Sequence, residues 1–275
     1  MNLKCYDFSG IRIGVQCEKM LDDDVRLQKF SDNCTQPDNL ITLEFRQTLP
    51  AVPNDKGGAE SEWTFKSTKL EAGLPEQPFV CTEFSGSKCN MYVLDRYKQA
   101  FDIGSVFRHL PLHHLLLKND ALILHGSYIL VNGEAIVFSA PSGTGKSTQA
   151  ELWRKHRNAQ IINGDRVLLR RTASGFTAGG IYYSGTSGIC ENVTAPVRTI
   201  ALISQEMQSS AVKCSGAEAF TRLFRECACS AEFEKDPADT AAIIADAVND
   251  VNIVKLGCLP DESAVEALAN YLQGR

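Results

Sequence analysis

Apolar and polar side chains alternate along much of the first hundred residues, which is the pattern of a strand with one buried face. The alternation runs over residues 11–15 and again over 41–46, and shorter strand-like pieces lie at Phe79–Glu83 and Met91–Leu94. Residues 50–58 are rich in Pro, Asn and Gly and predict a loop. The pattern predicts a β-rich N-terminal domain over residues 1–103.

The pattern changes after this region. Residues 104–118 predict a helix with a strongly apolar face at Leu115–Leu117, so we assign residues 104–120 to a linker helix. The second domain then covers residues 121–275.

The second domain opens with strands. Residues 121–125 read as one strand, and residues 127–140 read as a β-hairpin around Asn132-Gly133, a pair that accepts the positive φ angles of a tight turn. The uninterrupted apolar run at 135–138 is typical of a buried strand. A helix over 146–156 and a strand over 160–162 follow.

The tail predicts further helices. Apolar residues recur at helical spacing over 220–227 and 265–272, and Asp261 is placed to cap the last helix. Together these elements predict an α/β fold.

Composition narrows the class of protein. A chain of 275 residues suits about two domains. The net charge of −5 argues against nucleic-acid binding through bulk charge. No apolar run has the roughly 20 residues of a membrane span, and the N-terminus lacks a secretion signal. The ten cysteines form no CxxC pair, so we expect reduced thiols rather than a zinc site, in a cytoplasmic protein.

The strongest chemical signal is Ala140-Pro-Ser-Gly-Thr-Gly-Lys-Ser-Thr148. It fits the phosphate-loop pattern GxxxxGK[ST], with Ala140 in place of the first glycine, and it lies between a predicted buried strand and a predicted helix. Glycines let the loop turn its N–H groups toward an anion, and the helix start adds its positive dipole. The alternative is a Gly/Ser turn that joins the strand to the helix and binds no ligand. The residues expected to contact nucleotide are Ser142, Gly143, Thr144, Gly145, Lys146, Ser147 and Thr148.

A nucleotide-bound Mg²⁺ also needs a carboxylate from the protein, because Mg²⁺ prefers oxygen ligands. Asp165 ends the strand that follows the loop helix, 18 residues after Ser147, so we expect Ser147 and Asp165 to be the metal ligands. The alternative for Asp165 is a turn residue after Asn163-Gly164. His125 ends a strand upstream and reaches the phosphates only if the hairpin folds back beside the loop.

These residues occur in an order that resembles the core of HPr kinase/phosphorylase. The order is His125-Gly126-Ser127, a hairpin, the loop, one helix, and then Gly164-Asp165-Arg166-Val167. The same order is similar to ATP-dependent phosphoenolpyruvate carboxykinase, although this chain is too short for that enzyme. The layout also resembles HPr kinase-like proteins found with ribosomally made peptide clusters, including lasso-peptide precursor kinases. The resemblance covers about residues 121–170 and does not reach the first hundred.

The resemblance implies a phosphoenolpyruvate carboxykinase-like P-loop domain with a mixed sheet, which uses ATP and Mg²⁺. It also implies catalytic roles for Asp165, His125 and Lys146. HPr kinase carries two adjacent aspartates where this chain has Gly164-Asp165, so metal ligand, base or both stay open for Asp165, and His125 is a second candidate base.

We therefore predict a phosphotransferase that acts on a hydroxyl, the serine or threonine of a peptide, a small protein or a free amino acid. The β-rich domain would recruit that acceptor. The alternatives are a nucleotide-binding regulatory or scaffold protein without catalysis, which the lone aspartate favours, and a kinase that also runs in reverse.

Overall fold

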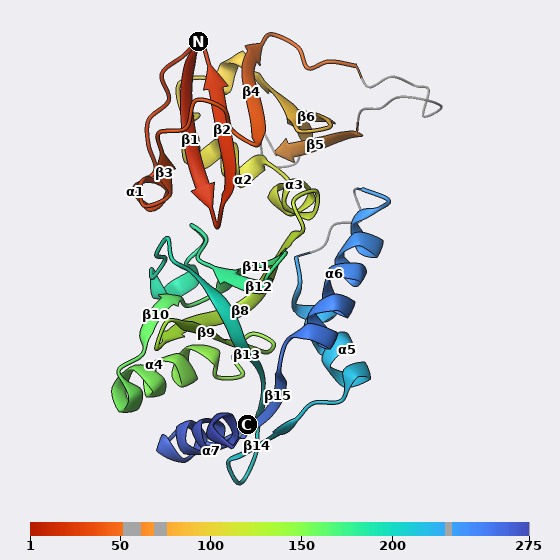
Figure 1. Ribbon diagram of the computed structural model, residues 1–275. Coiled ribbons are helices and arrows are strands. Elements are labelled where there is room, and N and C mark those ends of the chain that lie inside the picture. Colours follow the sequence, from red (N-terminus) through yellow and green to blue (C-terminus); the bar gives the residue numbers. More distant parts are fainter. Residues whose placement is uncertain (52–61, 69–75, 229–232, 275) are drawn as a thin grey trace. The chain divides into compact units, whose positions relative to one another are not determined.

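The computed structural model describes residues 1–51, 62–68, 76–228 and 233–274, and the chain divides into two compact units, Met1–Leu115 and Leu116–Arg275 (Figure 1). Each unit contains a mixed sheet, so the protein is of mixed α/β class. Most of the loop predicted over residues 50–58 lies outside the described residues.

The first unit is built on a seven-stranded sheet of order β3-β1-β2-β4-β7-β6-β5. Strands β2, β4 and β7 are parallel neighbours, and the other neighbours are antiparallel. The elements are β1 (Asn2–Phe8), β2 (Ile11–Cys17), α1 (Val25–Gln28), β3 (Ser31–Asp32), β4 (Asn39–Arg46), β5 (Glu62–Thr68), β6 (Gln77–Ser85), β7 (Lys88–Leu94), the 3₁₀ turn η1 (Asp95–Tyr97) and α2 (Ile103–His109).

The predicted alternation is present in these strands. Ile11, Ile13 and Val15 are buried in β2, while Arg12 between them is exposed. The expectation that every cysteine is reduced is wrong for one pair, because Cys5 and Cys34 form a disulfide with a Cα–Cα distance of 5.9 Å. The antiparallel pairing of β1 with β3 brings these two segments together.

The helix predicted over residues 104–118 is two short helices instead, α2 and α3 (Leu112–Leu117). Leu110 is extended, with φ −69° and ψ 131°, and Pro111 follows it. The proline ring disfavours helical backbone at the preceding residue, so the apolar face continues across a break in the helix. The two units divide within α3, between Leu115 and Leu116.

The strands of the second unit form a sheet that closes partly on itself. The order β10-β8-β11-β12-β13-β15-β14 is bridged by β9, which pairs with both β8 and β13. The elements are β8 (Ala121–Val131), β9 (Glu134–Ser139), α4 (Lys146–Arg157), β10 (Gln160–Asn163), β11 (Arg166–Thr172), β12 (Gly175–Gly179), the 3₁₀ turn η2 (Gly185–Ser187), β13 (Thr194–Gln205), β14 (Ser210–Lys213), α5 (Gly216–Glu226), α6 (Asp236–Asp250), β15 (Ile253–Cys258) and α7 (Glu262–Gln273).

The strand that leads into the loop is central to this unit. The turn between β8 and β9 has φ values of 51° at Asn132 and 82° at Gly133, as the predicted hairpin requires. The two strand pieces predicted before this turn form one continuous strand, β8. Strand β9 also pairs in parallel with β13, which in turn pairs in parallel with β15.

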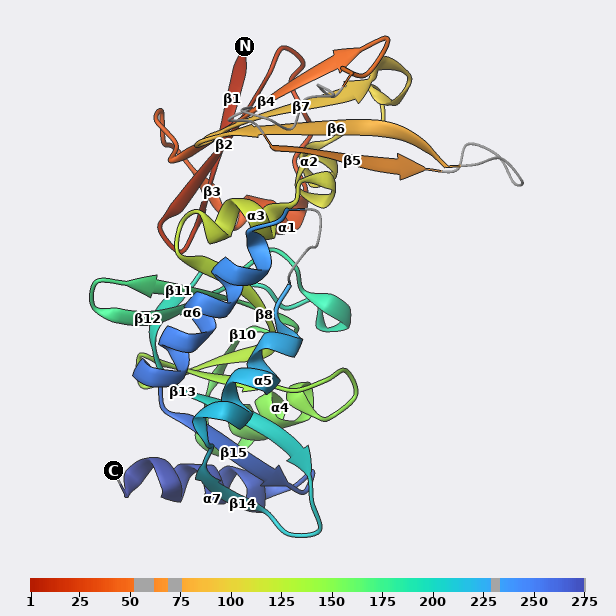
Figure 2. The ribbon, with the colours of Figure 1, turned by 90° about the vertical axis from the view of Figure 1, so that its right-hand side faces the viewer.

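Helices cover both faces of this sheet (Figures 1 and 2). Trp153 of α4 and Leu268 of α7 belong to one apolar core with Phe138 of β9. Leu223 of α5 and Ile244 of α6 belong to a second core. None of the helices in the described part of the chain is both long and apolar enough to cross a bilayer.

Candidate functional site

The predicted phosphate loop connects the end of β9 at Ser139 to the start of α4 at Lys146. Gly143 and Gly145 have φ values of 78° and 115°, which residues with a Cβ rarely adopt. These turns end at the helix N-terminus, where N–H groups have no carbonyl partner within the helix. A strand, a tight loop and a helix start therefore form an anion-binding arrangement.

Lys146 is the buried cation of this loop, with only 6% of its surface exposed. Its Nζ donates hydrogen bonds to the carbonyls of Ala140 (2.7 Å) and Pro141 (3.1 Å). Burial lowers the pKa of the Lys146 ammonium, and the carboxylates of Glu226 and Asp165 oppose that shift. The loop thus holds its own ammonium group beside two carboxylates.

The other predicted nucleotide contacts lie around Lys146. Ser142, Gly143, Ser147 and Thr148 are exposed, and Thr144 and Gly145 are partly exposed. Several of these residues line a cavity of about 370 Å³ together with the segment that follows β15; the lining includes Gly143, Thr144, Gly145, Thr148, Gln149 and Cys258. The loop therefore has open space on the side of its helix.

Asp165 is positioned by a residue that the sequence did not single out, the fully buried Asn163. The Asn163 Oδ1 accepts from the backbone N–H groups of Asp165 (2.9 Å) and Arg166 (3.0 Å). Its Nδ2 donates to the carbonyls of Ile181 (2.7 Å) and Tyr183 (2.8 Å). One amide thus fixes the turn between β10 and β11 against the segment before η2.

Gly185 packs directly against Asp165. A Cβ at Gly185 would lie 2.7 Å from the Asp165 Cβ, and the φ of Gly185 is 54°. The close approach and the positive φ both require glycine here. The η2 turn therefore restricts where the Asp165 side chain can lie.

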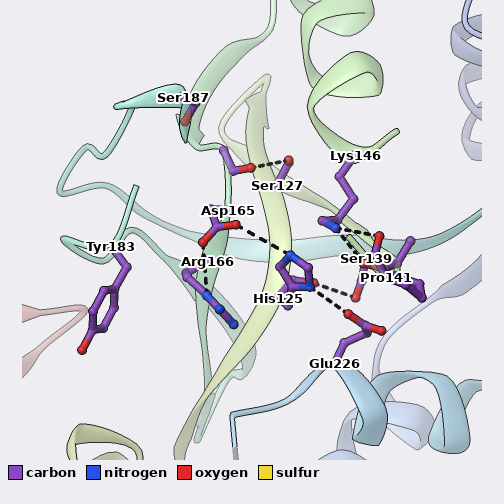
Figure 3. Close-up of polar contacts among 12 residues, drawn as sticks. His125, Ser127, Ser139, Pro141, Lys146, Asp165, Arg166, Tyr183, Ser187 and Glu226 are labelled. Atoms are coloured by element: carbon purple, nitrogen blue, oxygen red, sulfur yellow. Dashed lines mark hydrogen bonds and ion pairs between the residues drawn. The ribbon is translucent and has the colours of Figure 1, made fainter. Parts of the chain in front are cut away.

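His125 and Asp165 are brought together by neighbouring strands. His125 of β8 pairs with Arg166 of β11, and Gly126 N–H donates to the Asp165 carbonyl (3.0 Å). The His125 Nε2 lies 3.6 Å from the Asp165 Oδ1. The buried Ser139 hydroxyl donates to the His125 carbonyl (3.0 Å). The hairpin does fold back beside the loop, as the expectation for His125 required (Figure 3).

Glu226 is the functional candidate that the sequence analysis missed. It ends α5, and its Oε2 lies 2.8 Å from the His125 Nδ1. Antiparallel bridging of Cys227 to Leu124, and a hydrogen bond from Ala228 N–H to the Ile123 carbonyl (2.9 Å), hold this segment along β8. A carboxylate 101 residues from its partner gives no local sequence signal.

The site is therefore a compact group of charged side chains (Figure 3). The imidazole of His125 lies between Asp165 and Glu226, and Arg166 Nε lies 3.2 Å from the second Asp165 oxygen. Arg198, another arginine of this unit, pairs with Glu134 at 3.1 Å.

Both predicted metal ligands offer accessible oxygen atoms. The Asp165 side chain is 32% exposed, and Ser147 is exposed in the first turn of α4. A carboxylate and a hydroxyl, completed by phosphate oxygens and water, match the ligands that Mg²⁺ takes.

A second cavity, of about 400 Å³, lies beside the start of the loop. Its wall includes the loop start at Ala140 and Pro141, and Glu226 and Arg225 of α5. It therefore adjoins the His125–Glu226 pair.

Comparison with known proteins gives little further guidance. No protein-family model matches the chain, and no curated protein matches it. Among solved structures, the chain is similar to the Hpr(Ser) kinase/phosphatase from Coxiella burnetii, with 9% sequence identity and a TM-score of 0.31, over 55% of this chain and 97% of that one. A similarity this low establishes neither a shared fold nor a shared activity.

Proposed function

We propose that the protein is an ATP- and Mg²⁺-dependent kinase that transfers the γ-phosphate to a hydroxyl of a serine or threonine, in a peptide, a small protein or the free amino acid. The observation that carries the proposal is the convergence of three elements. The end of β9 at the start of the loop, the histidine of β8 and the aspartate before β11 lie beside one another. The second unit would then be a phosphoenolpyruvate carboxykinase-like P-loop domain, related to HPr kinase, in a cytoplasmic protein.

Each residue has a role in this reaction. The loop N–H groups and Lys146 would hold the β- and γ-phosphates, and Lys146 would exchange its loop carbonyls for phosphate oxygens. Ser147 and Asp165 would hold Mg²⁺, which supplies charge neutralisation when bound. Phosphoryl transfer depends mainly on positioning and charge stabilisation, so this set is sufficient.

The 400 Å³ cavity beside Glu226 would hold a part of the acceptor next to the reacting hydroxyl. The lining of that cavity includes carboxylates as well as guanidinium groups, which suits a polar acceptor. The N-terminal unit would recruit a larger acceptor that carries the hydroxyl.

The alternative is a regulatory or scaffold protein that binds nucleotide without catalysis. Gly164 stands where HPr kinase has its first aspartate, which favours this alternative. Glu226 weakens it, because the site still contains two carboxylates, both close to His125.

The test is transfer of label from γ-labelled ATP with Mg²⁺ to a panel of serine, threonine and short serine-containing peptides. Asp165→Asn is run in parallel, with Asp250→Asn, an exposed residue at the end of α6, as the matched control. Label in an acceptor that disappears only with Asp165→Asn supports the kinase. Saturable ATP binding with no label in any acceptor supports the nucleotide sensor.

A further inference from the structure

The imidazole of His125 has two different environments. Its Nδ1 lies 2.8 Å from the Glu226 Oε2, which is hydrogen-bond distance, whereas its Nε2 lies 3.6 Å from Asp165, which is beyond it. Figure 3 shows the ring between the two carboxylates. Glu226 is therefore the hydrogen-bonded partner of the ring, and Asp165 is a neighbour.

The Glu226 contact selects the tautomer of a neutral imidazole. An ionised carboxylate can only accept a hydrogen bond, so Nδ1 must carry the proton. The lone pair is then on Nε2, the atom that faces Asp165. A histidine without such a partner is free to place its proton on either nitrogen.

The backbone makes this contact specific. The first part of β8, residues 121–125, is held by β11 on one side and by the Cys227–Ala228 segment on the other, so both carboxylates reach His125 from flanking chain segments. The Glu226 side chain is only 13% exposed, which limits its screening by water. A largely buried carboxylate on a fixed backbone can orient a ring.

We propose that Glu226 is a positioning residue that holds His125 in the Nδ1–H tautomer, so that Nε2 is the base of the reaction and Asp165 is left to the metal. The proposal rests on the kinase function proposed above. The acceptor hydroxyl gives its proton to Nε2 as its oxygen bonds to the γ-phosphorus. The bond from that phosphorus to the bridging oxygen breaks, and its electron pair leaves with the nucleoside diphosphate. Glu226 stabilises the imidazolium that forms.

The test is an imidazole ¹H–¹⁵N correlation on the full chain labelled at its five histidines, at a pH where His125 is neutral. We expect Nδ1–H for His125 in the wild type, and a shift toward Nε2–H in Glu226→Ala and Glu226→Gln. In both variants the rate of phosphate transfer should fall by at least about tenfold. The loss should reach the hundredfold or more that a general base contributes if His125 no longer acts as base. Glu226→Asp should keep part of the Nδ1–H signal of His125 and part of the rate of phosphate transfer.

The chain offers a matched control in His156, whose Nδ1 lies 3.0 Å from the Glu262 Oε1 at the far end of α4. Glu262→Gln should change the His156 signal and leave the His125 signal and the transfer rate unchanged. An Nε2–H tautomer in the wild type, or an unchanged rate in Glu226→Ala, overturns the proposal. The tautomer of His125 can be measured without any substrate. Its result therefore distinguishes a failure of the Glu226 orienting role from a failure of the proposed kinase function. A wild type with Nδ1–H but no transfer to any acceptor overturns the kinase and the base role, and supports the orienting contact.

Discussion

Asn163 holds the aspartate turn together, and its removal should weaken the second unit measurably. In Asn163→Ala, two backbone N–H groups and two carbonyls lose their partner in a fully buried position. Each buried group left unpaired costs about 1–3 kcal/mol. Asp165 and Arg166 are partly exposed, so water can satisfy some of these groups. We therefore expect a loss of about 2–5 kcal/mol, a large share of the roughly 5–15 kcal/mol that stabilises a domain.

The assay is urea unfolding followed by tryptophan fluorescence. The chain has two tryptophans, Trp63 in the first unit and Trp153 in the second, so a Trp63→Phe background reports on the second unit alone. Asn270→Ala, at an exposed position of α7, is the control and should change the unfolding free energy by no more than about 0.5 kcal/mol. An Asn163→Ala midpoint as high as that of the control would refute the role of the Asn163 amide.

Three further predictions concern Gly185, Lys146 and the disulfide of the first unit. Gly185→Ala should abolish transfer and cost about 1–2 kcal/mol, because its Cβ would collide with Asp165 at a positive φ; a stability and transfer rate equal to wild type would contradict the packing. Burial lowers the pKa of Lys146 in the folded chain. At pH values between that lowered pKa and about 10.5, the Lys146 side chain therefore binds more protons in the unfolded chain than in the folded one. The unfolding free energy of wild type minus that of Lys146→Met should therefore rise with pH across this window, and a flat or falling difference in urea titrations would exclude a lowered pKa. Finally, Cys5 and Cys34 should not titrate in the unreduced, denatured chain, so at most eight of the ten thiols should react. Cys34→Ser should cost the first unit about 3–4 kcal/mol for a closed loop of this length (a sequence separation of 29); ten titrating thiols would rule the disulfide out.

Local patterns predicted the elements around the loop well. The hairpin, the loop helix and the capped last helix were predicted because each depends on neighbouring residues: an Asn-Gly turn, a Gly-Lys-Ser helix start and Asp261, whose side chain accepts from Ser263 N–H. Helix α6 and strands β13 to β15 were not predicted.

The rest of the site depends on contacts between distant segments. Glu226 reaches His125 only because Cys227 bridges to β8, and Gly185 reaches Asp165 through a turn with no motif. Asn163 was given no role of its own, and its four hydrogen bonds join two segments that the sequence does not link. The helix predicted over residues 104–118 failed for a local reason. Its apolar face continues across Pro111, so the apolar pattern alone did not reveal the break in the helix.

The central claim is that the loop after β9 binds nucleotide phosphates through Lys146. The most direct measurement is calorimetric titration of ATP with Mg²⁺ into wild type, Lys146→Ala and Lys155→Ala, the last an exposed lysine on the same helix. A charge-assisted hydrogen bond is worth about 1.5–3 kcal/mol, so Lys146→Ala should weaken binding by about 10- to 100-fold. Lys155→Ala should bind like wild type. Equal affinity of wild type and Lys146→Ala for ATP, or no binding by the wild type, would contradict the account.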